Sequence, residues 1–376
     1  MDAFYASVEL LRYPELRGRA VVIGGGHDHQ PRRRPDGTHD FHILRDYVGR
    51  GVVTTSTYEA RKLGVFSAMG MMKSAVLAPE AILLPVDFDE YRRYSRLFKA
   101  AVREIAPVVE DRGIDEIYID LSELPGVDQD GGRAVGVALK AAVRERTGLT
   151  CSIGITPNKL LSKLASELDK PDGLTLLPMS ALERRVWPLP VRKINGVGPK
   201  SARKLEGFGI KTVGDLAERE AGWLVEHFGA HYGAWLADAS HGRDDRDVVT
   251  YSEPKTMSRE TTFERDLSPK LDRDELSRVF TELCADVADD LSRSGYVAKT
   301  IGLKLRFDNF KTVTRVQTIE TPTSDAQTIR RTAGECLKRV TLDRRIRLLG
   351  VRVDNLSSSS GPVTRPDDAA PEPSLW

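Results

Sequence analysis

The order of hydrophobic and polar residues predicts a chain of mixed helices and strands. Apolar residues recur at helical spacing in segments 3–11, 91–106, 134–147, 159–169, 273–294 and 326–339. Runs rich in β-branched residues predict strands at 20–23, 52–57, 151–155, 300–307, 312–320 and 347–353. Residues 108–121 alternate around the acidic segment GIDEIYIDL, which indicates two strands joined by a turn.

The length and the distribution of turn residues predict several domains. The chain has 376 residues, more than one hydrophobic core usually holds. Residues 178–250 combine short helices with Gly and Pro between them, and residues 251–356 alternate helical patterns with strands. From residue 357 onward the chain is rich in Ser, Pro and Asp, so we expect a disordered tail.

Residues 27–50 are polar, rich in His and Arg, and contain Pro31 and Pro35, which predicts a long loop or an insertion. The segment holds four of the seven histidines: His27, His29, His39 and His42. A metal cluster is one interpretation. No Cys joins these histidines and Arg is frequent, so the pattern favours a surface excursion without a metal.

Composition and cysteine usage indicate the class of protein and its compartment. The chain is 40% hydrophobic and 30% charged, which is typical of a soluble globular protein. Its three cysteines form no CxxC motif, so a reducing compartment is expected. No apolar run is long enough for a membrane span, and the first residues show no signal-peptide pattern. We therefore expect a cytoplasmic, multidomain protein that does not contact membranes.

Charge is unevenly distributed along the chain. The totals, 56 Lys and Arg against 55 Asp and Glu, show no general preference for polyanions. Residues 293–352, however, contain 14 basic and 5 acidic residues. This segregation predicts a surface that binds nucleic acid, with an ordinary solvated charged face as the alternative.

Asp115 and Glu116 stand beside a run of Ile and Tyr. Carboxylates next to a buried strand need a compensating cation, and a divalent metal can supply one. Neighbouring residues of a regular strand point to opposite faces, so both acids can serve one site only at a turn or strand end. Gly113 permits such a turn. Solvated turn residues are the alternative.

Residues 194–200, INGVGPK, are typical of a helix-hairpin-helix motif. Gly196 and Gly198 let the backbone turn tightly, so amide groups at the next helix start can meet a phosphate. Lys200 and Arg203 add positive charge. The motif predicts duplex binding without sequence preference, and a plain corner between two helices is the alternative.

Five segments in order resemble one enzyme family: MDAFYASVE, TTSTYEARKLGV, GIDEIYIDL, CSIGITPNKLLSKLASELDKPDG and INGVGPKSARKL. Together they resemble the Y-family, lesion-bypass DNA polymerases, in particular the bacterial DNA polymerase IV branch. The resemblance implies an α+β, multidomain, right-hand polymerase. It places a ferredoxin-like palm at 1–3 and 86–177, and small fingers at 4–85 with an insertion at about 27–50. A helical thumb with the helix-hairpin-helix follows at 178–250, an α+β little finger at 251–356, and a tail at 357–376.

The resemblance also implies roles for individual residues. Asp115 and Glu116 match two acids that hold two Mg²⁺ ions, and Glu116 would bind the ion that lowers the pKa of the primer 3′-hydroxyl. Residues that would contact the triphosphate are Tyr58, Arg61 and Lys170. Tyr5 matches the aromatic under the sugar, which excludes a 2′-hydroxyl. Arg259, in the segment SRETTF, is the matching phosphate or template contact.

One departure from the family pattern concerns the metal site. The family's first metal-binding Asp lies on the strand before MDAFYASVE, and Asp2 matches a second Asp that is not a ligand. Without that strand, ladder groups of the palm sheet would stay unpaired. A start codon placed at an internal Met is the favoured explanation. A natural chain that binds metals poorly is the other.

The resemblance implies template-directed, low-fidelity DNA synthesis past damaged bases, with primer-template DNA and deoxynucleoside triphosphates as substrates. A catalytically inactive DNA- and clamp-binding adaptor is the alternative, and a helix-hairpin-helix nuclease is a third interpretation. Residues Glu372–Trp376 resemble the tail motif that docks bacterial polymerases on the sliding clamp. We expect a monomer.

Overall fold

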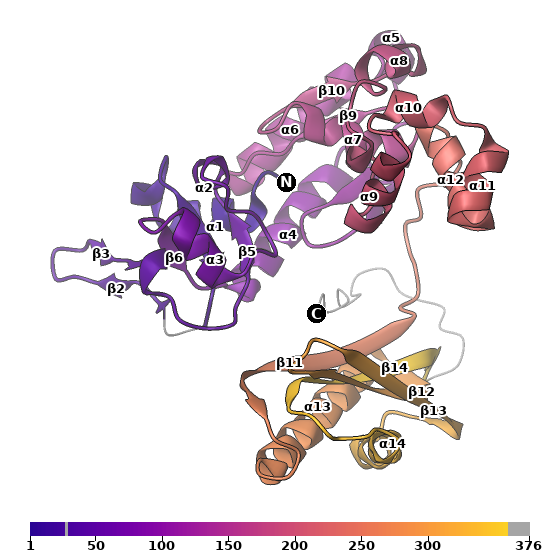
Figure 1. Cartoon of the computed structure of the whole chain (residues 1–376). Coiled ribbons are helices and arrows are strands. Elements are labelled where there is room, and N and C mark those ends of the chain that lie inside the picture. Colours follow the sequence, from indigo (N-terminus) through magenta and orange to yellow (C-terminus); the bar gives the residue numbers. More distant parts are fainter. Residues whose placement is uncertain (27–28, 360–376) are drawn as a thin grey trace. The chain divides into compact units, whose positions relative to one another are not determined.

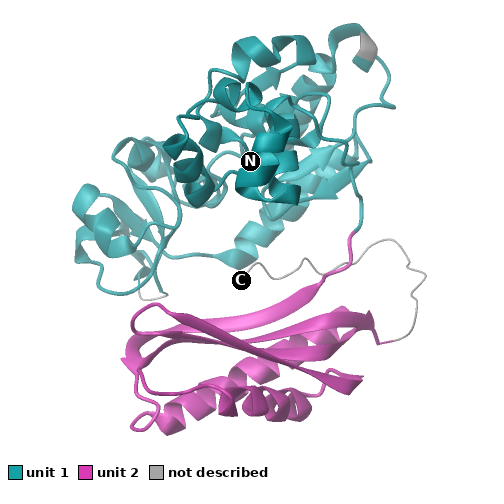
Figure 2. Cartoon of the chain, turned by 45° about the vertical axis from the view of Figure 1, so that its right-hand side comes forward, with its two compact units in different colours: residues 1–251 teal, residues 252–376 magenta. Residues whose placement is uncertain are grey.

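The computed structural model describes residues 1–26 and 29–359. The chain divides into two compact units, Met1–Tyr251 and Ser252–Trp376 (Figure 2). Among the described residues, no helix is both long and apolar enough to cross a membrane.

The first part of unit 1 is built on a four-stranded sheet in the order β4-β6-β1-β5. Its strands are β4 (His42–Ile43), β6 (Ile82–Leu84), β1 (Val21–Gly24) and β5 (Val53–Ser56). Strand β1 pairs parallel to β6 and antiparallel to β5. Helices of this part are α1 (Phe4–Arg12), α2 (Tyr58–Lys62) and α3 (Met71–Leu77), with short 3₁₀ turns at Pro14–Leu16 and Leu44–Asp46. All four residues of β1 are buried, which explains its continuous apolar run.

The predicted insertion is more ordered than a plain loop. It contains an antiparallel ribbon of β2 (Arg32–Arg33) and β3 (His39–Asp40), and its end supplies β4 to the main sheet. The His39 and Phe41 rings lie 5.1 and 5.4 Å from the Tyr13 ring, and this aromatic contact anchors the ribbon to the end of α1.

The next part of unit 1 holds two separate two-stranded sheets. The hairpin of β7 (Val109–Asp111) and β8 (Ile117–Ile119) is antiparallel, and β9 (Ile153–Ile155) pairs parallel to β10 (Leu174–Leu176). The helices around them are α4 (Phe88–Arg103), α5 (Val127–Asp130), α6 (Arg133–Thr147) and α7 (Lys159–Leu168). Strands β8 and β9 do not pair with each other, so the two strand pairs form separate sheets.

The last part of unit 1 is helical. It comprises a 3₁₀ turn at Met179–Ala181, α8 (Leu182–Arg185), a 3₁₀ turn at Val191–Lys193, α9 (Pro199–Gly207), α10 (Val213–Ala217), α11 (Ala221–Phe228) and α12 (Ala230–Ser240) (Figure 1). Helices α11 and α12 pack closely at Gly233, where a Cβ atom would lie 2.4 Å from the Leu224 carbonyl oxygen. A larger residue at Gly233 would force these helices apart.

Unit 2 is an antiparallel sheet with two helices on one face (Figure 1). The strand order is β11-β14-β12-β13, formed by β11 (Thr256–Leu267), β14 (Ile346–Ser358), β12 (Tyr296–Phe307) and β13 (Thr312–Thr323). Helices α13 (Arg273–Ser294) and α14 (Ala326–Lys338) bury an apolar core against the sheet. Strand β14 continues through Ser358 because it pairs with β12 there, so a tail beginning at residue 357 was predicted too early.

Candidate nucleotide and metal site

Sequence-predicted residues from separate segments meet at one cavity of about 280 Å³ in unit 1. Its wall includes Tyr5 from α1, Arg61 from α2, Asp115 from the turn before β8, and Lys170 from the turn after α7. The remaining lining residues are Met1, Ala3, Phe4, Thr54, Thr55 and Ser67. The arrangement combines two cations, a carboxylate and an aromatic ring around one small space.

The two adjacent acids lie at a strand end, as the spacing required. The Arg112 amide donates to the Glu116 carbonyl at 3.0 Å and closes the turn, in which Gly113 adopts a φ of 149°. Asp115 is half-buried, and this burial raises the pKa of its carboxyl group. The Met1 ammonium donates to the Asp115 carbonyl at 2.8 Å. Both acids also line a second cavity in unit 1, of about 840 Å³.

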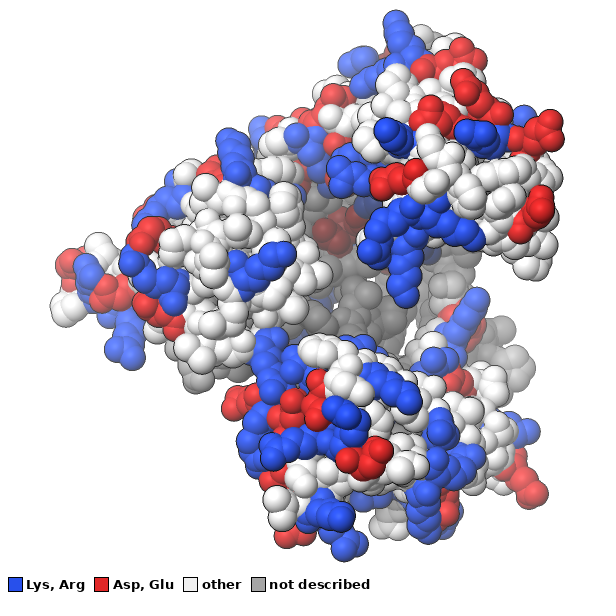
Figure 3. All heavy atoms as spheres, in the orientation of Figure 1, with Lys and Arg blue, Asp and Glu red and all other residues white. Residues whose placement is uncertain are grey.

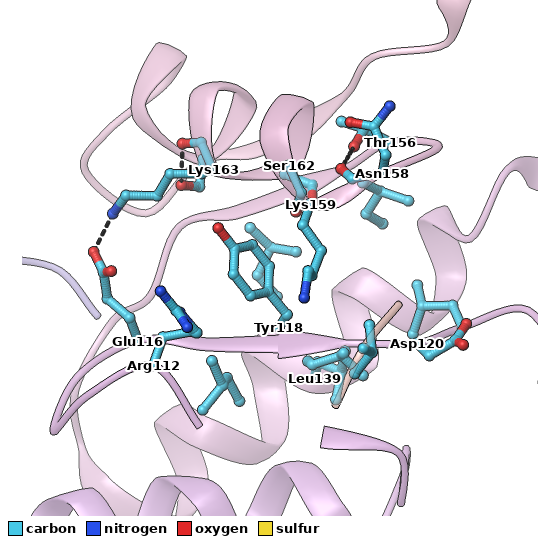
Figure 4. A pocket seen from close by; sticks show the side chains of 18 of the residues that line it. Arg112, Glu116, Tyr118, Asp120, Leu139, Thr156, Asn158, Lys159, Ser162 and Lys163 are labelled. Atoms are coloured by element: carbon cyan, nitrogen blue, oxygen red, sulfur yellow. Dashed lines mark hydrogen bonds and ion pairs between the residues drawn. The ribbon is translucent and has the colours of Figure 1, made fainter. Parts of the chain in front are cut away.

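Lys163 of α7 forms an ion pair with Glu116 (Figure 4). The sequence analysis did not single out this lysine. Lys159 and Lys163 are four residues apart, so they lie on one face of α7, and this spacing could have identified Lys163 from the sequence. Lys163 therefore contributes a positive charge directly beside the acidic pair.

Asp2 has a structural role. One of its carboxylate oxygens accepts from the Ser152 hydroxyl at 2.7 Å, and the other from the Asp172 amide at 2.9 Å. The side chain is buried, yet these hydrogen bonds outweigh the desolvation and lower the pKa of Asp2. Asp2 thus fixes the turn that carries Lys170.

Tyr58 and Arg61 lie side by side, because α2 places residues three apart on one face. The Arg61 guanidinium lies 4.9 Å from the centre of the Tyr58 ring, and its Nε donates to the Ser56 carbonyl at 3.2 Å. The Tyr58 hydroxyl is the one buried side-chain polar atom without a hydrogen-bond partner in the described part of the chain. Burial raises the pKa of Tyr58 to about 12, so the group is a neutral donor.

Lys170 lies at the cavity, 2.7 Å from the Glu167 carboxylate. The Lys170–Pro171 peptide bond is cis, and Asp172 has a φ of 57°. This compact KPDG turn is held by the Asp2 carboxylate and by Lys140, which donates to the Asp172 carboxylate at 2.6 Å. The turn therefore presents Lys170 from a fixed backbone.

The donor atoms present suit a hard divalent cation. Mg²⁺ prefers oxygen ligands and is commonly held by one or two carboxylates together with substrate phosphates. Asp115 and Glu116 supply two such carboxylates. No group of three or more His, Cys, Asp or Glu side chains that could hold a metal ion occurs among the described residues. His27 lies outside them.

A larger cavity of about 840 Å³ is lined by residues of both β8 and β9 (Figure 4). Ile117 and Ile119 line it from β8, and Ile153 and Ile155 from β9. Polar side chains at its wall include Tyr118 and Lys159, whose ammonium lies 5.6 Å from the tyrosine ring centre. The β7–β8 pair and the β9–β10 pair form separate sheets, and β8 and β9 both contribute residues to the wall of this cavity.

The hairpin of the predicted helix-hairpin-helix precedes α9. Gly196 has a φ of 112°, and a Cβ atom there would lie 2.6 Å from the Trp235 ring. The Tyr232 hydroxyl donates to the Gly196 carbonyl at 3.0 Å. Gly198 caps α9, and Lys200 in its first turn is exposed. Arg203 is also exposed, with its Nε 3.3 Å from the Pro199 carbonyl.

Arg259 on β11 is held in a bidentate ion pair with Asp290 on α13, at 2.6 and 2.8 Å. It therefore faces the helices of unit 2. The opposite face of the sheet carries exposed or half-buried basic side chains that the sequence analysis did not name individually. They are Lys304 and Arg306 on β12, and Arg352 on β14. Successive side chains of a strand point to opposite faces of the sheet, and this alternation could have identified these residues from the sequence. Figure 3 shows many Lys and Arg side chains on the visible face of unit 2, interspersed with Asp and Glu.

Three family descriptions match this chain. The impB/mucB/samB family matches residues 1–167, its C-terminal domain residues 254–365, and the family's HHH motif residues 180–210. DNA polymerase IV of Methanoculleus marisnigri is 38% identical over 365 residues, which cover 97% of this chain and 94% of the relative. DNA polymerase IV of Alkalilimnicola ehrlichii is 38% identical over 95% of this chain and 93% of its own length.

The chain belongs to the impB/mucB/samB family of Y-family DNA polymerases. As a member it is a DNA-directed DNA polymerase for translesion synthesis, a nucleotidyltransferase that acts on primer-template DNA and deoxynucleoside triphosphates. Polymerases of this family generally use divalent metals. The inactive adaptor has no better support from these relatives.

Solved polymerase structures confirm the fold. A Y-family DNA polymerase chimera, Dbh-Dpo4(243-245)-Dbh, superposes with a TM-score of 0.76 at 23% identity, covering 94% of this polymerase and 96% of that chain. DinB from Sulfolobus solfataricus gives a TM-score of 0.60 at 22% identity, with the same coverage. The predicted α+β, multidomain polymerase fold is therefore correct.

Proposed function

We propose that this polymerase extends a DNA primer at the 280 Å³ cavity, with Asp115 and Glu116 holding two Mg²⁺ ions. When bound, such ions lower the pKa of the primer 3′-hydroxyl and neutralise charge on the triphosphate. The observation that carries the assignment is the convergence of Tyr5, Arg61, Asp115 and Lys170 on one cavity from four separate segments.

The triphosphate is bound by Arg61 and Lys170 at the cavity wall, and by Tyr58, which lies beside Arg61 but is not among the lining residues. Arg61 and Lys170 supply two cations at the cavity wall, and a guanidinium can contact phosphate oxygens in bidentate fashion. The buried Tyr58 hydroxyl lacks a partner, which is costly unless a ligand oxygen accepts its hydrogen bond. A triphosphate oxygen is such an acceptor.

Tyr5 selects the sugar. Its side chain is half-buried and lines the same cavity as Arg61 and Asp115. A flat ring at that wall leaves no room for a 2′-hydroxyl, so deoxynucleotides are preferred over ribonucleotides.

DNA is held by the hairpin at Gly196 and Gly198, with Lys200 and Arg203, and by unit 2. The start of α9 offers unpaired backbone amides for a phosphate, and Lys200 adds an exposed cation. In unit 2 the surface away from the helices carries Lys304, Arg306 and Arg352. Arg259 acts there through its ion pair with Asp290, which orders β11 against α13.

The proposal also covers the sliding clamp as a partner, the oligomeric state and the cellular location. Residues Glu372–Trp376 dock on the sliding clamp, and the polymerase acts as a monomer in the cytoplasm. Residues 372–376 lie outside the described residues, so their sequence alone supports docking. Deletion of residues 372–376 is expected to abolish stimulation of synthesis by the clamp. Unchanged stimulation would contradict the docking.

The assignment of the triphosphate site is tested with Tyr58→Phe in a steady-state primer-extension assay. The variant removes only the buried hydroxyl, so KM for each deoxynucleotide should rise about tenfold, as loss of one hydrogen bond to a charged group predicts. Unchanged KM would show that the hydroxyl does not contact the nucleotide.

A further inference from the structure

The Tyr5 ring is stacked against a second tyrosine. Its centroid lies 4.3 Å from that of Tyr91 on α4, and the two planes are inclined by only 18°. Phe88, one turn earlier on α4, meets both rings edge-on, at 5.9 Å from Tyr5 and 5.7 Å from Tyr91. Packing on one face and at one edge leaves the Tyr5 ring few alternative orientations.

Tyr91 is itself fixed by a buried carboxylate. Its hydroxyl donates to Glu9 of α1 at 2.7 Å, and the exposed fractions are 0% for Tyr91 and 3% for Glu9. Arg12, one turn further along α1, lies 3.8 Å from the Glu9 carboxylate and also pairs with Asp87 just before α4. Because a buried polar group is costly to leave unpaired, this network holds the Tyr91 ring in one position.

The network joins α1, which carries Tyr5, to α4. Glu9 lies one turn after Tyr5 on α1, and Tyr91 lies on α4, so the hydrogen bond fixes the helix that carries Tyr5 as well as the ring behind it. Tyr5 lines the cavity, and its ring is the one stacked on Tyr91. A displacement of Tyr91 would open space into which the Tyr5 ring could withdraw.

We propose that Tyr91 is a positioning residue for sugar discrimination: held by Glu9, its ring keeps the Tyr5 ring at the cavity wall and so excludes the 2′-hydroxyl of a ribonucleotide. The inference rests on the proposed role of Tyr5. Tyr91 does not line the cavity and acts only through Tyr5.

The test is the ratio of kcat/KM for a deoxynucleotide to that for the matching ribonucleotide, measured by single-nucleotide primer extension. For Tyr91→Leu the ratio should fall about three- to tenfold, the factor that corresponds to loss of one aromatic pair. Tyr91→Phe keeps the stacked ring and should retain the wild-type ratio. If the Leu variant does not fold, Tyr91→Met, which fills the volume without a flat ring, replaces it.

Tyr94→Leu on the same helix is the matched control: Tyr94 packs against the same core, and the Arg93 guanidinium lies 4.5 Å from the centre of its ring. It should leave the ratio unchanged. A purely structural role for Tyr91 would lower kcat/KM for both sugars together and leave the ratio constant, and that outcome would overturn the proposal.

A double variant separates this inference from the role assigned to Tyr5. If Tyr91 acts through Tyr5, Tyr5→Ala/Tyr91→Leu should have the same ratio as Tyr5→Ala alone. If Tyr5→Ala itself leaves the ratio at the wild-type value, the assigned role of Tyr5 fails and this inference fails with it. If Tyr5→Ala lowers the ratio while Tyr91→Leu and Tyr91→Met do not, only the inference fails.

Discussion

The Lys159 ammonium on α7 donates to the Glu110 carboxylate on β7 at 2.6 Å, and both side chains are only 9% exposed. The same two side chains also form hydrogen bonds with the backbone of the last residues of unit 1. Lys159 also donates to the Asp247 carbonyl at 2.5 Å, and the Val249 amide donates to Glu110 at 2.9 Å. The buried ion pair therefore joins β7, α7 and the last residues before Tyr251.

Removing one partner of this pair should destabilise unit 1. Glu110→Ala leaves the Lys159 ammonium buried without its counter-charge, which is expected to lower the free energy of unfolding by about 3–5 kcal/mol. Urea denaturation followed by circular dichroism measures the change. Arg92→Ala removes an exposed pair with Asp89 and should cost less than about 1 kcal/mol. An equal loss of unfolding free energy in both variants would contradict a special role of the buried Lys159–Glu110 pair.

The same pair predicts a pH dependence of stability. Burial alone would raise the pKa of Glu110, but the hydrogen bonds from Lys159 and the Val249 amide, with the nearby Arg112, outweigh it and lower the pKa. A carboxyl group with a lowered pKa in the folded state stabilises the fold above its unfolded pKa of about 4.3 and loses that contribution as the pH falls. Wild-type stability should drop below pH 5 more steeply than that of Glu110→Gln. Parallel curves would contradict the assignment.

Arg61 should contribute to nucleotide binding. Arg61→Ala removes one cation from the cavity, so KM for deoxynucleotides should rise about tenfold or more, as expected for lost charge-assisted hydrogen bonds. Primer extension at varied nucleotide concentration measures this. Arg45→Ala, which removes an exposed cation paired with Glu80 outside the cavity, is the matched control. A rise in KM for the control alone would refute the assignment.

The hairpin at Gly196 should be intolerant of any side chain. Gly196→Ala places a Cβ atom against Trp235 at a φ of 112°, so the turn must shift and the affinity for duplex DNA should fall about tenfold. Fluorescence anisotropy with a labelled primer-template measures it. Gly222→Ala in α11 has open space for a Cβ and should bind like the wild type. Equal affinity of both variants would argue against the DNA-binding assignment.

The sequence predicted long, periodic elements better than contacts. Helix α13 was predicted at its observed bounds, because its apolar residues repeat over 22 positions. The ribbon of β2 and β3 was predicted as a loop, since two-residue strands carry no periodic signal. Asp115 and Lys170 were predicted from motifs, whereas the contacts of Lys163, Glu110 and Tyr91 join distant segments and had no local pattern. Arg259 illustrates the same limit, because its pairing with Asp290 depends on the packing of α13.

The central claim, that Asp115 belongs to the catalytic metal site, is tested most directly by primer extension with Asp115→Asn in the full chain. The substitution preserves size and removes the charge. The account predicts extension by the wild type and by Asp120→Asn, and none by Asp115→Asn at any Mg²⁺ concentration, with affinity for primer-template DNA unchanged. Extension by Asp115→Asn at the wild-type rate would contradict it.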